Sequence, residues 1–136
     1  MKKKIINIIG VLFIILIIQQ AYWYNALEGN LVIYVTNVSE KDSLEINLYL
    51  DDKLIKKESY SNSEFYKFKN YPINIFPGKH SITVTTKNGE VKEKCDFYSF
   101  FVKRIIIEYQ GEDNQLDNNK KFLIESEPVF RNLIIR

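Results

Sequence analysis

Histidine and cysteine, two residue types that can act in catalysis or bind metals, occur once each in the chain, as His80 and Cys95. A catalytic histidine needs a nucleophile and an orienting acid within reach, and a zinc site needs three or four ligands. Ser81 follows His80, but neighbouring residues of a strand point to opposite faces of a sheet. The sequence therefore predicts a structural role for His80 and a small-hydrophobe role for Cys95, with no catalytic residue, no metal site and no cofactor.

Two acidic patterns could also carry chemistry. Asp51 and Asp52 are adjacent carboxylates, and a hairpin turn accounts for both of them. A later segment alternates like a calcium-binding loop, at Asp113, Gln115, Asp117 and Asn119. An EF-hand has glycine at the sixth position of its loop, where this chain has Asn118, and ends on a glutamate. The sequence therefore favours a solvated loop over a calcium site.

Residues 1–28 are predicted to be a membrane-targeting segment. An apolar run over residues 5–18 is flanked by residue types that fix a helix across a bilayer, namely Lys2, Lys3, Lys4, Tyr22, Trp23 and Tyr24. The lysines favour the cytoplasmic side, and the aromatic rings suit the opposite interface. A helix of about 20 residues crosses roughly 30 Å of hydrocarbon. We expect a signal-anchor that holds the rest of the chain outside the cytoplasm.

Cleavage of this segment is the alternative, and it would make the protein a secreted one. Signal peptidase selects small side chains at the last and third-last positions before the cut. Cutting after Ala21 places Gln19 at the third-last position, and cutting after Ala26 places Tyr24 there, so the uncleaved anchor is favoured. Gly10 before an apolar run also weakly resembles a type IV prepilin processing site.

Composition restricts the function classes of the remainder. The formal net charge is +2, but without the three N-terminal lysines 16 basic residues face 17 acidic ones. No basic patch indicates nucleic-acid binding. A single cysteine cannot form an internal disulfide, so stability must come from packing. Residues 29–136 suffice for one domain with one core.

That domain is predicted to be all-β, an antiparallel sandwich of about seven to nine short strands. Four aliphatic residues alternate with polar ones over 44–50, which places them on one face of a strand. Asn88-Gly89 predicts a hairpin turn, and the prolines around 73–76 predict an edge or a crossover. The expected strands are 31–38, 44–50, 54–59, 65–69, 82–85, 91–97, 104–110, 122–125 and 129–135.

Two segments carry a resemblance to a known family. Residues 48–55 (LYLDDKLI) and 76–84 (FPGKHSITV) resemble the small bacterial extracytoplasmic Ig-like sandwiches of the PEGA type. Asp52 stands where those domains have glycine in the first turn. The resemblance implies an Ig-like β-sandwich that binds proteins or the cell wall and has no active site.

Aromatic residues exceed what a domain of this size can bury. The candidate partner-binding residues fall in two groups, and they are Phe65, Tyr66, Phe68, Tyr98, Phe100 and Phe101. Surplus aromatic surface is typical of a binding site, and the alternative is that both groups belong to the core or to the edge of the sandwich. We expect a membrane-anchored, non-catalytic interaction module, an accessory subunit of a bacterial cell-envelope complex. A binder of glycans or small ligands is the alternative.

Overall fold

The computed structural model describes residues 2–64, 67–87, 89, 91–111 and 121–129. Within these residues one long helix is followed by eight strands and one short 3-10 helix. The elements in chain order are α1 (Lys2–Ala26), β1 (Leu31–Asn37), β2 (Ser43–Leu50), β3 (Lys53–Ser61), η1 (Asn62–Glu64), β4 (Lys69–Ile73), β5 (Gly78–Thr86), β6 (Lys92–Ser99), β7 (Lys103–Tyr109) and β8 (Phe122–Pro128).

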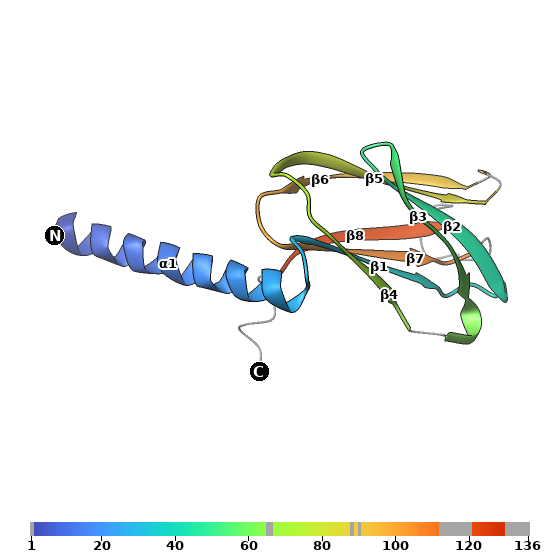
Figure 1. The fold of residues 1–136 in the computed structure, drawn as a ribbon, viewed down its shortest axis with the longest axis horizontal. Coiled ribbons are helices and arrows are strands. Elements are labelled where there is room, and N and C mark those ends of the chain that lie inside the picture. The colour runs from blue at the N-terminus through green and yellow to red at the C-terminus, as the bar shows by residue number, and fades with distance from the viewer. Residues whose placement is uncertain (1, 65–66, 88, 90, 112–120, 130–136) are drawn as a thin grey trace.

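The strands form two four-stranded sheets that lie one above the other in Figure 1. One sheet has the order β4-β1-β7-β8 and the other has the order β3-β2-β5-β6. The prediction of a mostly β chain with one N-terminal apolar helix is confirmed. The prediction of an entirely antiparallel arrangement is wrong at one pair, because β1 and β7 run parallel. These strands are far apart in the sequence, so no tight hairpin forces them to be antiparallel.

A single core joins the two sheets. Ile33 and Val35 of β1 are fully buried together with Ile105 and Ile107 of β7, and they pack in one cluster with residues of the opposite sheet, Ile46, Leu48, Ile82 and Val84. Alternation along each strand sends these aliphatic side chains inward. Strand β7 lies between β1 and β8, so it is central in its sheet.

The strand predicted over 65–69 is wrong in its position. The observed strand β4 begins at Lys69, and residues 65 and 66 lie outside the described residues. Pro72 lies inside β4, which pairs only with β1 at the edge of its sheet. An edge strand tolerates proline because one of its sides needs no ladder hydrogen bonds. The edge predicted from the prolines is therefore present, but it starts before residue 73.

The C-terminal prediction is tested only in part. Strand β8 runs through Pro128, which is longer than the predicted 122–125, and it pairs with β7 along its whole length. The predicted strand 129–135 and the loop with the calcium-like spacing lie almost entirely outside the described residues, as does Asn88 of the predicted hairpin turn. Gly89 of that turn has a φ of 68°, a left-handed value that glycine adopts without strain.

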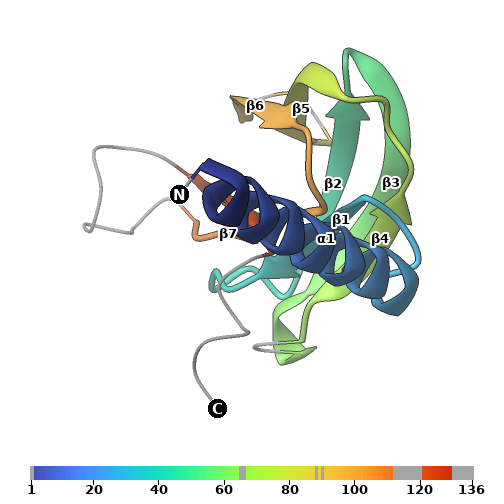
Figure 2. The ribbon, with the colours of Figure 1, turned by 90° about the vertical axis from the view of Figure 1, so that its left-hand side faces the viewer.

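Helix α1 extends away from one end of the two-sheet domain (Figure 1). Its segment Ile5–Ala26 is long and apolar enough to be a membrane anchor or a signal sequence, and none of it is buried against the domain as a core helix would be. Figure 2 looks along the helix toward the end of the domain from which it leaves. We call this end of the two-sheet domain the proximal end.

Candidate functional site

The joint between α1 and the domain is closely packed. Asn30 donates from Nδ2 to the carbonyl of Ile75 (2.6 Å) and accepts from the Ile75 N–H at Oδ1 (2.8 Å). A side chain at Gly29 would place its Cβ 2.8 Å from the Ile73 carbonyl oxygen, so only glycine fits here without a backbone shift. Glu28 has a φ of 58°, which turns the chain out of the helix. The helix is thus attached through a short, fixed connection.

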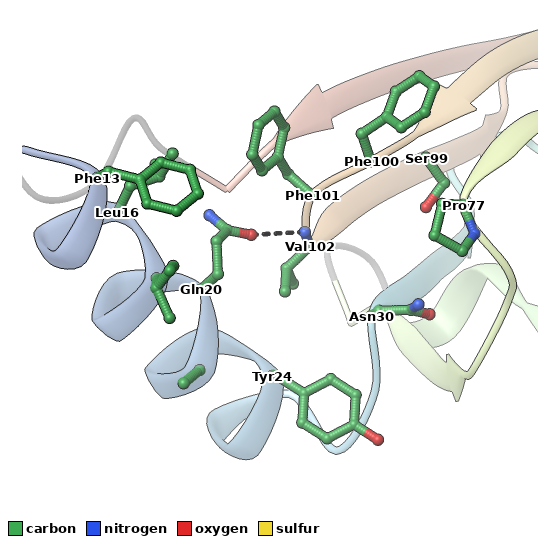
Figure 3. A pocket seen from close by; sticks show the side chains of 12 residues that line it. Phe13, Leu16, Gln20, Tyr24, Asn30, Pro77, Ser99, Phe100, Phe101 and Val102 are labelled. Carbon is green, nitrogen blue, oxygen red and sulfur yellow. Dashed lines mark hydrogen bonds between the residues drawn. The ribbon is translucent and has the colours of Figure 1, made fainter. Parts of the chain in front are cut away.

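A hollow of about 460 Å³ lies between α1 and the β6–β7 connection (Figure 3). The Val102 N–H donates to Gln20 Oε1 (2.7 Å), which ties the connection to the last turns of the helix. The helix side of the hollow is mostly apolar and includes Phe13, Leu16, Ile17 and Ala21. Phe100 and Phe101 line the opposite side. The hollow therefore continues the apolar surface of the helix onto the domain.

Exposed aromatic rings gather at the same end. Phe76 in the β4–β5 connection is 86% exposed, and Phe100 and Phe101 in the β6–β7 connection are 66% and 43% exposed. Tyr98 is 59% exposed and stacks on Phe100, with ring centroids 6.3 Å apart. We call Phe76, Tyr98, Phe100 and Phe101 the proximal aromatic patch. Phe76 was not among the site residues predicted from the sequence. Its place in a short segment between Pro72 and Pro77 was the signal that could have indicated an exposed loop.

The other group of candidate aromatics does not join this patch. Phe68 precedes Lys69, which pairs with Val35, whereas the β6–β7 connection precedes Lys103, which pairs with Leu31. Four residues of β1 separate these positions, or about 13 Å at the usual rise of a strand. Phe68 packs edge-on against Tyr34 instead, with ring centroids 6.4 Å apart. Phe65 and Tyr66 lie outside the described residues.

Tyr60 and Tyr71 form a polar cluster between the edge strands β3 and β4. The Tyr71 hydroxyl donates to Glu58 Oε2 (2.8 Å) and lies 2.6 Å from the Tyr60 hydroxyl. Because Tyr71 has one hydrogen and gives it to Glu58, Tyr60 must be the donor in the tyrosine pair. Lys69 Nζ donates to Glu58 Oε1 (2.7 Å) and lies 5.1 Å from the centre of the Tyr60 ring. The cluster joins the two sheets along one side.

The ionisation of this cluster follows from burial and hydrogen bonding. Burial raises the pKa of Tyr60 to about 12. The pKa of Tyr71 is raised by burial and by its bonds to Tyr60 and Glu58. The Lys69 ammonium and then the Tyr71 hydroxyl lower the pKa of Glu58. At neutral pH the cluster therefore holds one carboxylate, one ammonium and two neutral hydroxyls, which satisfy one another and leave no group activated for chemistry.

His80 is held by two acceptors. Its Nδ1 lies 2.6 Å from Asp51 Oδ2 and its Nε2 lies 2.7 Å from the Phe76 carbonyl oxygen. A carbonyl and a carboxylate can only accept, so this geometry favours the protonated ring, in which both nitrogens donate. The hydrogen bond to Asp51 also raises the pKa of His80, which favours the protonated ring. An imidazolium with both hydrogens in use cannot act as a general base.

Asp51 is also committed to the fold. Asp51 and Asp52 have left-handed φ values of 49° and 64°. They are the two central residues of a type I′ hairpin turn. The free carboxylate oxygen of Asp51, Oδ1, accepts from the Ser81 N–H (2.8 Å). Partial burial opposes ionisation, but the bonds from His80 and Ser81 outweigh it and lower the pKa of Asp51. The hairpin predicted for the two aspartates is therefore present, and it fixes the loop that carries Phe76.

The remaining chemical candidates do not converge. Cys95 is half-buried on β6, with Sγ 3.7 Å from the Asp96 carbonyl oxygen. Within the described part of the chain, no three histidine, cysteine, aspartate or glutamate side chains are placed to hold a metal ion. The residues with calcium-like spacing, from Asp113 to Asn119, lie outside that part.

The anchor residues selected from the sequence lie on α1. Tyr22 is exposed and meets Trp23 edge-on, with ring centroids 5.4 Å apart, and Tyr24 is exposed in the last turns of the helix. Lys2, Lys3 and Lys4 belong to the first turn of the helix, and their side chains lie outside what the structure describes. No family model, curated protein or solved structure matches the chain.

Proposed function

We propose that this protein is a membrane-anchored, extracytoplasmic interaction module without catalytic activity, an accessory subunit of a cell-envelope complex. The observation that carries the proposal is the short, fixed joint between an exposed apolar helix and the two-sheet domain. A cleaved signal sequence has no need of a joint that locks it to the mature domain. The joint supports a helix that stays attached.

The polar groups of the domain support a non-catalytic role. His80, Asp51 and Glu58 are each bonded to structural partners, and none of the three faces a described cavity with a free nucleophile beside it. The hollow at the proximal end is lined mostly by apolar residues. A catalytic site needs converging polar groups with tuned pKa values. Binding through apolar and aromatic surface is the chemistry that the described residues favour.

The domain itself fits an Ig-like sandwich of the PEGA type, in which the hairpin at Asp51 and the entry into β5 at Pro77 and Gly78 would be the shared features. Such a module would meet a protein partner at the end opposite the membrane, where Phe68 and Tyr34 are exposed or half-exposed. A glycan would need free hydrogen-bonding groups around the rings. Lys69, which follows Phe68 in the sequence, already donates to Glu58 and to the Ser59 carbonyl, which favours a protein partner.

The orientation is tested by labelling thiols in intact cells. In a Cys95→Ser background, Lys92→Cys places a thiol on an exposed position of β6, and Lys3→Cys places one before the apolar run. A membrane-impermeant maleimide should label the first variant in intact cells or spheroplasts and the second only after permeabilisation. Equal labelling of both, or recovery of the chain in the cytosol, would contradict the proposal.

The interaction is tested at the distal end of the same anchored protein. A photo-crosslinking side chain at position 68 should give one discrete adduct in membranes, and the same side chain at Lys53, which is exposed at the start of β3 and away from the distal end, is the matched control. The adduct should disappear when Tyr34→Ser removes the neighbouring ring. Smears of similar intensity from both positions would contradict docking at this end.

A further inference from the structure

We infer that the proximal aromatic patch is a second membrane contact, which inserts Phe76, Phe100 and Phe101 into the outer interface of the bilayer that α1 crosses. The inference rests on the proposed anchor, and it goes beyond it by fixing how the domain meets the lipid. The occupant of the patch is the boundary between headgroups and acyl chains.

The hydrogen bond between Val102 and Gln20 sets the depth of the patch. An α-helix rises 1.5 Å per residue, so about 20 residues are needed to cross roughly 30 Å of hydrocarbon. Counted from Ile5, the first residue of the span, this length ends at Tyr24. Gln20 then lies about 6 Å below the outer boundary of the hydrocarbon. The β6–β7 connection is bonded to the end of the Gln20 side chain, which places the connection close to this boundary.

The apolar run of the helix supports the same depth. Residues 5–18 cover only about 21 Å at 1.5 Å per residue, which is short of the hydrocarbon thickness. Gln19 and Gln20 come next, and in lipid an uncovered amide is costly. The Val102 N–H donates to Gln20 Oε1, whereas the buried Gln20 Nε2 has no hydrogen-bond partner within the described part of the chain. Phe101, the residue before Val102, lines the same hollow as Gln20 (Figure 3). The β6–β7 connection therefore covers the helix at the point where the apolar run of the helix ends.

The exposure of the patch has no explanation within the domain. Among the described residues of the two-sheet domain, Phe76 is the most exposed large hydrophobic residue, and Phe100 and Phe101 lie beyond the end of the buried core. Rings placed about 5–10 Å into the headgroup and acyl boundary are typical of interfacial segments. Both loops have cationic residues directly after their apolar tip: Lys79 and His80 after Pro77-Gly78, and Lys103 and Arg104 after Val102. Cations near the headgroups suit this arrangement.

The hollow beside α1 fits lipid better than it fits a solute. It is lined by Phe13, Leu16 and Ile17 of the span on one side and by the β6–β7 connection on the other. At the depth set by Gln20, these helix residues lie within the hydrocarbon layer. An acyl chain can fill a space of about 460 Å³ with apolar walls, whereas water would leave those walls solvated at membrane depth.

Tryptophan reporters in the full chain test the inference. Trp23 is the only tryptophan, so Trp23→Phe gives a background in which Phe100→Trp reports on the patch. The matched control is Phe68→Trp in the same background, and Phe76→Trp is a second reporter should the first variant fold poorly. Each protein is reconstituted into phosphatidylcholine vesicles with and without brominated acyl chains. We expect Phe100→Trp to lose roughly half of its emission to bromine, because bromine quenches rings buried about 5–10 Å in the boundary. Phe68→Trp should keep its emission.

The unsubstituted protein separates failure of the inference from failure of the anchor. Quenching of Trp23 with an unquenched Phe100→Trp reporter overturns the lipid contact and leaves the anchor in place. An unquenched Trp23 overturns both. A Phe100→Trp reporter shielded from bromine and also from aqueous iodide would show that a protein, such as a second copy of the chain, covers the patch, and it would likewise overturn the lipid contact.

Discussion

Two aromatic regions of this domain differ in how their rings are exposed and bonded. Between β3 and β4, the Tyr60 hydroxyl bonds to the Tyr71 hydroxyl, which donates to Glu58, and lysine ammonium groups lie over both rings. At the proximal end, Phe76, Phe100 and Phe101 project from two connections and remain exposed. The tyrosine rings of the first region are bonded between the two sheets, whereas the phenylalanine rings of the second keep large exposed fractions.

The difference shows which aromatic residues indicate function. A tyrosine at a sheet edge can pack its ring inward and give its hydroxyl to a partner, so it closes the side of a sandwich. A phenylalanine at a loop tip has no polar group to satisfy and gains nothing from water. Exposed phenylalanine on a fixed loop therefore indicates an external apolar partner, whereas a dense tyrosine cluster does not.

The largest test of this comparison is truncation of one tyrosine from each region. Tyr60 is 2% exposed, and Tyr60→Ala should lower the free energy of unfolding by about 3–5 kcal/mol, because it removes a buried ring and leaves a cavity. Tyr98→Ala should change it by less than about 0.5 kcal/mol, since the ring is exposed. Urea unfolding of the detergent-solubilised full chain measures both. Equal losses would show that the two regions do not differ in their contribution to the fold.

A smaller effect is expected from the charge at the centre of the tyrosine cluster. Glu58→Gln should cost about 1 kcal/mol at neutral pH, since its bonds to Lys69 and Tyr71 are charge-assisted but partly exposed to solvent. The bonds from Lys69 and Tyr71 lower the pKa of Glu58 from 4.5, so the stabilisation is present above pH 4.5 and is lost as the pH falls through the lower, folded-state pKa.

The measurement for Glu58 is the free energy of unfolding between neutral and acidic pH. The unsubstituted protein should lose more stability on acidification than the Glu58→Gln variant. Glu93→Gln on the edge strand β6 is the matched control and should keep the acid response of the unsubstituted protein. Identical acid responses for all three proteins would show that ionisation of Glu58 does not stabilise the fold.

Much of the fold could be predicted because burial imposes a period of two. Ile46 and Leu48 alternate with polar residues, so the buried face of their strand follows from the sequence. The parallel pairing of β1 with β7 could not be predicted, because it depends on which sheet each strand joins. The position of β4 was also missed, since hydrogen bonding to β1 outweighs the local signal of Pro72.

The candidate site was less predictable than the fold. The sequence divided the aromatic candidates into two groups but could not show how far apart these lie, and the register along β1 is what separates Phe68 from Phe100 and Phe101. The His80–Asp51 pair joins residues 29 positions apart, so no local pattern shows it. Gln20 was seen only as the end of an apolar run. Its bond to Val102, which sets the depth of the patch, depends on how the helix joint is packed.

The His80–Asp51 pair gives a weaker pH response of opposite sign to that of Glu58. Asp51→Asn should cost at most about 0.5 kcal/mol, because the carboxylate is half exposed and screened by water. The bond to Asp51 raises the pKa of His80, so its stabilisation is fully present below pH 6.5 and is lost as the pH rises through the folded-state pKa. Unfolding measured from pH 5 to 9 should show this loss in the unsubstituted protein and not in Asp51→Asn or His80→Gln. A response that survives in both variants would assign it to another group.

The smallest effect on folding is expected from the patch itself, and there the comparison is sharpest. The double variant Phe100→Ser/Phe101→Ser should change the free energy of unfolding in detergent by no more than about 0.5 kcal/mol, because both rings lie outside the core. In vesicles it should loosen the domain on the membrane, since one of its two attachments is lost.

A dye attached through Ser63→Cys in a Cys95→Ser background reports the distance from the distal end to dyes on the lipid surface. The protein with the intact patch should give one narrow distance distribution and the double variant a broader one, while Phe68→Ser, which removes an exposed ring from the opposite end, should leave the distribution narrow. A narrow distribution for all three proteins would mean that the helix joint alone orients the domain.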